Sequence, residues 1–297
     1  MKTSVTTYSF AQYIRAGKLT QIDCVNKAKE IGFDGIEFTT LSPKENATHE
    51  DRIAYAKEIR KRADEVGIEI VSYTIGASLY QPDKAARDAE VERLCRELDV
   101  AAVLGAKVMR HDVCYSEKTA IGTVGFMRMV PEIAAAAREV TEYARKLGIK
   151  TCTENHGFIA QDSYRIEALF NEVGSDNYGV LVDVGNFSCA DEDSITAVSR
   201  LAPYAVHVHA KDFKKIPYGT DTEENGLVTR ACNKIIPTAI GDGDIPVKQC
   251  IAILKRAGYD GYLSVEFEGA EDCITAIARG KARLDEYIKE AEAYKVK

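Results

Sequence analysis

A short unit recurs along this chain: a helical pattern ends, a glycine follows, and a run of apolar residues begins. The residues Ile-Gly-Phe-Asp-Gly at 31–35 return as Ala-Gly-Tyr-Asp-Gly at 257–261, and shorter copies centre on Gly67, Gly105 and Gly148. Glycine adopts the left-handed conformation that closes many helices, and β-branched residues suit the buried strand that comes next. The unit therefore predicts repeated steps from a helix into a buried strand.

Strand and helix patterns alternate along the whole chain. Expected strands cover 3–8, 33–38, 68–74, 106–110, 149–154, 178–183, 204–209 and 262–267, and expected helices cover 20–31, 48–66, 83–104, 125–147, 161–173, 191–202, 246–257 and 271–292. Strict alternation indicates a parallel α/β fold with right-handed crossovers. Eight strands favour a closed barrel, and no glycine-rich dinucleotide motif follows the first strand to support an open sheet. We therefore predict a single (β/α)8 TIM barrel domain over residues 1–297.

One connection, after the seventh expected strand, is much longer than the others. Residues 211–244 show neither helical nor strand periodicity and contain several glycines and prolines. Loops of this length are usually functional or disordered. Because this loop follows the strand that ends at His209, we expect it to be an active-site loop that acts as a lid or contacts substrate. An inert insertion is the alternative.

Four residues stand at the C-terminal ends of expected strands: Glu154, Asp183, His209 and Glu266. In a barrel these ends meet on the face that carries the active site. Three carboxylates gathered there would repel one another strongly, and a divalent cation removes that repulsion. Oxygen-rich ligation favours Mn²⁺, with Mg²⁺, Co²⁺ or Zn²⁺ also suited. Taken singly, each acid could instead cap a helix or pair with a lysine, but four consecutive strand ends together favour one metal site.

The segments around these residues are Thr153–Gly157, Val182–Phe187, His207–Phe213 and Ser264–Gly269. With them the chain resembles, over essentially its whole length, the xylose isomerase-like TIM barrel superfamily of sugar (phosphate) isomerases and epimerases. The resemblance implies that Glu154, Asp183, His209 and Glu266 bind one divalent metal ion. It also implies that Glu154 and Glu266 move protons to and from a substrate carbon.

The expected reaction is therefore a metal-dependent isomerisation or epimerisation of a small carbohydrate by proton transfer through a cis-enediolate. The same site would serve a lyase or dehydratase acting on a keto-sugar or inosose, including one that deglycosylates an oxidised glycoside. A non-catalytic sugar-binding barrel is a further alternative. Apurinic endonucleases of the same superfamily use three zinc ions, but Asn186 stands here where they carry a histidine. The absence of an evident phosphate-binding motif favours a non-phosphorylated substrate.

Five further residues are candidates for substrate binding. His111 ends the fourth expected strand, His156 follows Glu154, Lys211 follows the seventh strand, and Glu37 ends the second. His207 lies two residues before His209, so both side chains point to the same face of the strand. Each of the five has an ordinary structural alternative: a packed histidine, a solvated lysine or a salt-bridged glutamate.

Charge and cysteine content limit the partners and the compartment. The formal net charge is −7, from 39 basic and 46 acidic residues, and no basic stripe is present, which argues against nucleic-acid binding. No apolar run is long enough for a transmembrane helix, and no signal-peptide pattern opens the chain. The eight cysteines form no Cys-x-x-Cys pair. We expect a cytoplasmic protein; many members of the superfamily are dimers or tetramers, although no segment here marks an interface.

Overall fold

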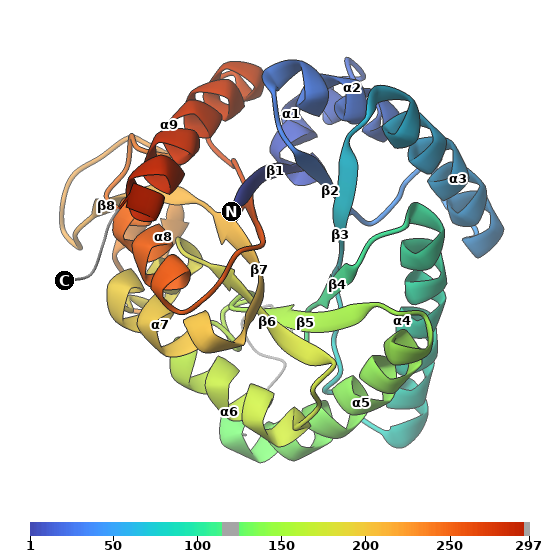
Figure 1. The fold of residues 1–297 in the computed structure, drawn as a ribbon. Coiled ribbons are helices and arrows are strands. Elements are labelled where there is room, and N and C mark those ends of the chain that lie inside the picture. The colour runs from blue at the N-terminus through green and yellow to red at the C-terminus, as the bar shows by residue number, and fades with distance from the viewer. Residues whose placement is uncertain (115–124, 294–297) are drawn as a thin grey trace.

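The computed structural model describes residues 1–114 and 125–293, and in them eight parallel strands close into a barrel. The strands are β1 (Lys2–Thr6), β2 (Gly35–Thr39), β3 (Glu69–Ile75), β4 (Val108–His111), β5 (Lys150–Glu154), β6 (Tyr178–Asp183), β7 (Ala205–Ala210) and β11 (Tyr262–Val265). Around the barrel they follow the order β1-β11-β7-β6-β5-β4-β3-β2, so the first and last strands pair and close it (Figure 1). The predicted TIM barrel is confirmed.

Helices surround the barrel, one between each pair of successive barrel strands and one after the last. They are α2 (Gln21–Ile31), α3 (His49–Val66), α4 (Lys84–Leu104), α5 (Phe126–Lys146), α6 (Ser163–Val173), α7 (Ser194–Leu201), α8 (Val247–Arg256) and α9 (Cys273–Ala293). Thr20 caps α2 and Thr48 caps α3, each through a hydroxyl that accepts a hydrogen bond from the third helical N–H. Gly32 and Gly67 close the same helices in left-handed conformation, as the recurring unit predicts.

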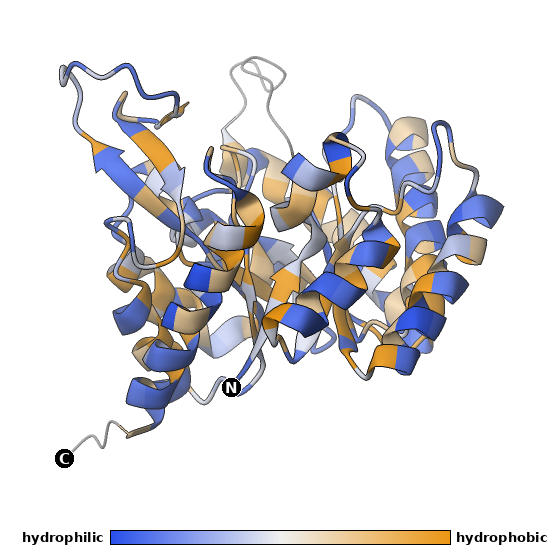
Figure 2. Ribbon diagram, turned by 90° about the horizontal axis from the view of Figure 1, so that it is seen from above, coloured by the Kyte–Doolittle hydropathy of each residue, from blue (hydrophilic) through white to orange (hydrophobic). Residues whose placement is uncertain are grey.

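The hydrophobic core lies between the strands and the helices. Helix α5 contributes Phe126, Met129, Ile133, Ala137 and Val140, which are buried at the three- and four-residue spacing of one helix face. The helices carry hydrophilic and hydrophobic stretches on different sides (Figure 2). None of the helices in the described parts of the chain is long and apolar enough to cross a membrane. All eight cysteines are free thiols.

The first strand is shorter than predicted. We expected it to span 3–8, but β1 ends at Thr6, and a 3-10 helix, η1 (Thr7–Phe10), and a short helix, α1 (Ala11–Arg15), follow. The Thr6 hydroxyl accepts a hydrogen bond from the backbone N–H of Tyr8, which turns the chain out of the strand. A five-residue helix has too few turns to show a periodic pattern in sequence.

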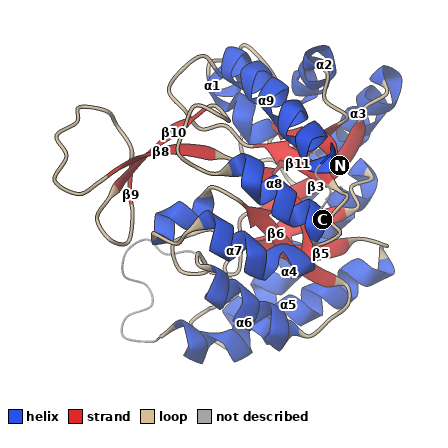
Figure 3. Ribbon diagram, turned by 60° about the vertical axis from the view of Figure 1, so that its left-hand side comes forward, coloured by secondary structure: helices blue, strands red, loops and turns tan. Residues whose placement is uncertain are grey.

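We expected the long segment after β7 to be irregular, but it contains a three-stranded antiparallel sheet. Its strands are β8 (Asp212–Ile216), β9 (Leu227–Val228) and β10 (Lys234–Thr238), with β10 in the middle. We call residues 211–244 the arm; it projects from the barrel on the side opposite to the N-terminus (Figures 2 and 3). Much of this sheet is exposed, so its strands lack the alternation of apolar and polar residues that would have revealed them.

Asp212 ties the two ends of the arm together. Its carboxylate accepts hydrogen bonds from the backbone N–H groups of Phe213, Gly241, Gly243 and Ile245, at 2.9–3.1 Å. A Cβ at position 243 would lie 2.2 Å from the Asp212 carboxylate, so only glycine fits there. The start and the end of the arm are therefore held against each other at the top of β7.

Replacing Asp212 by Asn puts an NH₂ group where a carboxylate oxygen accepts two N–H donors. We expect the free energy of opening the base of the arm to fall by about 2–4 kcal/mol, because buried donors lose their acceptor. Hydrogen exchange of the 239–245 peptides, followed by mass spectrometry, should speed up. Asp221→Asn, at an exposed position on the same arm, is the matched control. Unchanged exchange in Asp212→Asn would contradict the anchoring role.

Candidate metal centre

The four predicted strand-end residues converge on one point inside the top of the barrel. Glu154 ends β5, Asp183 ends β6, His209 lies near the end of β7, and Glu266 follows β11 directly. One ligand atom from each lies within 4.8 Å of the others. The side chains of the first three are fully buried, and that of Glu266 is 10% exposed. The four residues thus meet, although up to 112 positions separate them in sequence.

The spacing of the ligand atoms suits a single divalent ion. Nδ1 of His209 lies 3.5 Å from a Glu154 oxygen, 3.9 Å from an Asp183 oxygen and 3.3 Å from a Glu266 oxygen. Two ligands about 2.1 Å from one ion would be about 3.0–4.2 Å apart. Within the cluster, Nδ1 of His209, Oδ2 of Asp183 and Oε2 of Glu266 are buried without a hydrogen-bond partner. A bound ion would account for three such atoms that face one another.

The electrostatics of the cluster also call for a cation. Burial raises the pKa of Asp183 to about 7, and Lys211 only partly offsets the repulsion from Glu154 and Glu266. Burial would likewise raise the pKa of Glu266, but Lys211 and His209 lower it to about 2. The nearby positive charges are therefore too few for all the carboxylates of the cluster to ionise easily at the same time. Bound between them, a divalent ion would supply the missing charge.

Glu154 is fixed by two residues in addition to its neighbours in the cluster. Arg110, from β4, donates two guanidinium N–H groups to Oε2 of Glu154, one of them over 2.7 Å. Asn186, in the 3-10 helix η2 (Asn186–Ala190), donates its amide to Oε1 over 3.0 Å. Although burial opposes ionisation, Arg110 and His209 hold the pKa of Glu154 well below its ordinary value. Glu154 is a rigidly held anion.

Lys211 lies beside Glu266 and Asp183 of the cluster. Its buried ammonium lies 2.6 Å from Oε2 of Glu266, 3.5 Å from Oδ2 of Asp183 and 3.5 Å from Glu268, and it donates a hydrogen bond to Asn186. Burial would lower the pKa of Lys211, but these carboxylates, with Glu266 foremost, raise it well above its ordinary value. Lys211 was predicted to bind substrate, with a solvated lysine as the alternative; it is buried, and its partners in the structure are carboxylates of the site.

Glu37 and His207 lie one layer below the four residues. Both are fully or almost fully buried, and the Glu37 carboxylate accepts hydrogen bonds from the imidazoles of His207 and His209. Neither side chain therefore reaches the open face where a substrate would approach. Although burial alone would raise the pKa of Glu37, His209 and His207 hold it well below its usual range.

The two other predicted histidines lie in different places. His156 is at the rim: its side chain is 37% exposed, and Nδ1 lies 3.0 Å from the Asp112 carboxylate, which in turn faces Arg110. His111 points outward from β4. Its ring lies 6.3 Å from that of Tyr178, which packs on Phe170 of α6. Of the pair, His156 lies at the open rim of the site, whereas His111 belongs to the layer between strands and helices.

Sequence reasoning missed Arg110, which takes the position inside the barrel that we expected for His111. The strand register contains the signal that would have found it. Arg110 pairs with Cys152, and Cys152 shares a strand face with Glu154 two residues later. Asp112 and Asn186 were also missed as contacts of the site, because both lie just past strand ends, where no period applies.

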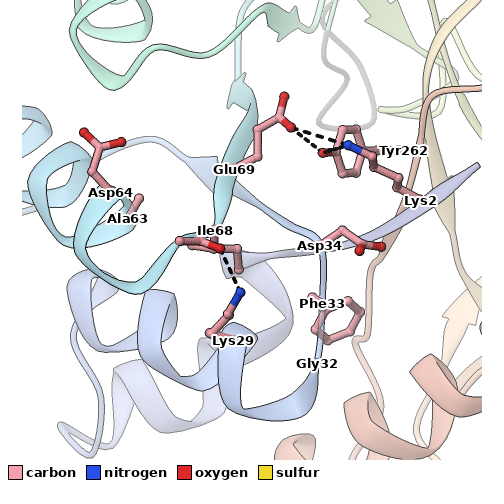
Figure 4. A pocket seen from close by; sticks show the side chains of 11 residues that line it. Lys2, Lys29, Gly32, Phe33, Asp34, Ala63, Asp64, Ile68, Glu69 and Tyr262 are labelled. Carbon is pink, nitrogen blue, oxygen red and sulfur yellow. Dashed lines mark hydrogen bonds and ion pairs between the residues drawn. The ribbon is translucent and has the colours of Figure 1, made fainter.

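A surface groove at the opposite end of the barrel has no such chemistry (Figure 4). Its lysines and Glu69 already have partners within the protein: Lys2 lies 3.9 Å from Glu69, which accepts a hydrogen bond from Tyr262, while Lys29 donates to the Gly67 carbonyl. The groove lies at the N-terminal ends of β1, β3 and β11, the face of such barrels that serves stability rather than catalysis.

Comparison with known proteins shows which family this chain resembles. The xylose isomerase-like TIM barrel family matches residues 25–295. Rhizopine catabolism protein MocC of Rhizobium meliloti is 26% identical over 258 residues, which cover 82% of this chain and 74% of that protein. Inosose dehydratase of Lacticaseibacillus casei is 25% identical over 137 residues, so that match spans about half of either chain, 46%.

Solved structures share the fold at lower identity. A D-tagatose 3-epimerase-like protein superimposes with a TM-score of 0.71 at 21% identity, over 99% of both chains. The IOLI protein, solved with a zinc atom bound, gives a TM-score of 0.75 at 16% identity, over 98% of this chain and 99% of that one. Because the family match runs along nearly the whole closed barrel, this chain belongs to the xylose isomerase-like TIM barrel family, whose relatives are sugar isomerases, epimerases and dehydratases.

Proposed function

We propose that this protein is a divalent-metal-dependent isomerase or epimerase that acts on a small carbohydrate by proton transfer through a cis-enediolate. The observation that carries the proposal is the convergence of Glu154, Asp183, His209 and Glu266 within 4.8 Å at the ends of four strands. These four would hold the ion, with Mn²⁺ the best suited to three carboxylates and one imidazole. Its charge would stabilise the negative oxygens of the enediolate.

The two glutamates are not equivalent in this proposal. Both oxygens of Glu154 already accept hydrogen bonds, from Arg110 and Asn186, and its side chain is fully buried. Glu266 is the most exposed of the four residues and borders the open face. We therefore assign proton removal from the substrate carbon to Glu266. A role for Glu154 in returning the proton, as the family resemblance implies, would require Arg110 or Asn186 to release an oxygen.

Charge favours a neutral substrate. The site holds the carboxylates of Glu154, Asp183, Glu266 and Glu268, with Glu37 directly below, against the cations Arg110 and Lys211. If a divalent ion is added to these five carboxylates and two cations, the formal net charge of the site is still not positive. An unphosphorylated sugar or cyclitol, with hydroxyl groups for His156 and Lys211, fits this balance better than a sugar phosphate does.

A dehydratase is the second candidate, because inosose dehydratases are among the sequence relatives. The first step, removal of a proton beside a carbonyl, would be the same. Loss of a hydroxyl beta to the resulting carbanion would then replace the return of the proton. His156 lies at the rim, where it can reach a departing hydroxyl, so the geometry is compatible with this reaction as well.

Proton NMR in D₂O tests the proposal directly. The metal-free chain is loaded with Mn²⁺, incubated with a panel of ketoses and inososes, and freed of Mn²⁺ with chelator before the spectra are recorded. We expect the C–H beside the carbonyl to exchange, and the product signals then separate epimerase, isomerase and dehydratase. Glu266→Gln should slow exchange by about 10²–10⁴-fold, since it removes the base.

Glu271→Gln is the matched control for that experiment, because Glu271 follows the same strand but is exposed and paired with Arg279, outside the site. It should keep most of the exchange activity. Exchange that persists in Glu266→Gln would refute the assigned base. No exchange of any panel compound by a chain that binds Mn²⁺ with one-to-one stoichiometry would refute the proton-transfer proposal.

Arg110 should be essential for the stability of the metal-free site. Arg110→Met leaves the Glu154 charge buried without its cation, which costs about 3–5 kcal/mol of unfolding free energy. Adding Glu154→Gln removes that charge, so the double variant should recover most of the loss in urea denaturation. If the effects of the two substitutions merely add, the pair is not coupled and Arg110 has another role.

A further inference from the structure

The carboxylate of Glu37 is the centre of a buried polar network below the metal site. Oε1 accepts hydrogen bonds from Nε2 of His209 over 2.9 Å and from the Thr74 hydroxyl over 2.8 Å. Oε2 accepts from His207 and from the Ser264 hydroxyl, the latter over 3.2 Å. Three other strands of the barrel, β3, β7 and β11, thus supply donors to a single side chain from β2. Such a network is rigid because every member is held.

Glu37, His207 and His209 also lie close enough together to resemble a second metal site. The hydrogen bonds argue against that interpretation. Both oxygens of Glu37 are already occupied by two donors each, and the side chain is fully buried. A cation there would have to displace the hydroxyl of Thr74 or Ser264 and turn both imidazoles. The cluster is better explained as a support for one ligand.

We infer that Glu37 is a positioning residue that fixes the orientation and tautomer of His209 in the metal site. The inference rests on the metal centre proposed above. With Glu37 accepting the N–H at Nε2, Nδ1 of the neutral imidazole would present its lone pair to an ion held among the carboxylates of Glu154, Asp183 and Glu266. A carboxylate behind a ligating histidine commonly orients it in this way, and its loss typically weakens metal binding 10–100-fold.

His207 completes the support from the same strand. Its imidazole donates to the second oxygen of Glu37, so the carboxylate is held between two rings that lie 5.6 Å apart and nearly perpendicular. Ser264 adds a donor and is itself joined to Ser4 of β1 over 2.6 Å. Glu37 cannot rotate away from His209 without breaking contacts on β3, β7 and β11. His207 therefore acts indirectly, through Glu37, rather than on a substrate.

Calorimetric titration of the metal-free full-length chain with Mn²⁺ tests this role without any substrate. Glu37→Gln keeps the size of the side chain but has only one acceptor oxygen for two imidazole donors. We expect its Mn²⁺ affinity to fall about 10–100-fold. Glu97→Gln is the matched control, because Glu97 is also a buried glutamate but accepts its hydrogen bonds from Arg52 and Tyr73, outside this network; its Mn²⁺ affinity should stay close to that of wild type.

Nitrogen NMR of the Zn²⁺-loaded chain gives a second readout that does not depend on the variant folding. The chain has only five histidines, so ¹⁵N-histidine labelling yields a simple spectrum, assigned by single His→Gln variants. We expect His209 to carry its proton on Nε2 and the metal on Nδ1. Metal on Nε2, or wild-type affinity in a folded Glu37→Gln, would overturn the inference. A wild-type chain that binds neither Mn²⁺ nor Zn²⁺ would overturn the metal centre first, and this inference with it.

Discussion

The structure depends on how buried negative charge is compensated inside the barrel. Glu37, Glu154 and Asp183 are fully buried, and carboxylates in such a place cost several kcal/mol each unless they are paired and hydrogen-bonded. Glu37 has four donors and Glu154 has Arg110 and Asn186. Asp183 and Glu266 each keep one buried oxygen without a hydrogen-bond partner, and both oxygens face Nδ1 of His209. The charge that the protein leaves uncompensated is thus confined to the place where a cation would bind.

This compensation requires the strand register to be correct around the whole barrel. Side chains alternate between the inside and the helix layer, so a shift by one residue in β4 would exchange Arg110 for His111 and leave Glu154 without its cation. Closure enforces the register, because β1 pairs with both β2 and β11 and no strand edge is free to slip. The buried polar side chains of this barrel therefore stay paired only because closure fixes the strand register.

The sequence predicted the position of a side chain where a local pattern determines it. It did not where the position depends on pairing with a strand that is distant in sequence. Glu154, Asp183, His209 and Glu266 were predictable because each ends an apolar run, and strand ends meet in a barrel. The inward position of Arg110 depends on pairing with β5, which no local period reveals. We expected Glu37 to end its strand, but it lies in the middle of β2, so its side chain lies below the site, where Thr74 and two histidines donate hydrogen bonds to it. The strands of the arm were missed because they are short and only partly buried, so no alternation of apolar and polar residues marks them.

The arm and the metal centre are joined through consecutive residues. Lys211 enters the site beside Glu266, and the next residue, Asp212, closes the base of the arm. The backbone of Lys211 passes so close to Gly185 that a Cβ there would lie 2.8 Å from its carbonyl oxygen, which fixes the lysine against the loop after Asp183. Movement of the arm would therefore be resisted at the same point that holds the Lys211 ammonium. Because that ammonium lies 2.6 Å from Oε2 of Glu266, the anchor of the arm contributes to the charge balance of the four-residue cluster.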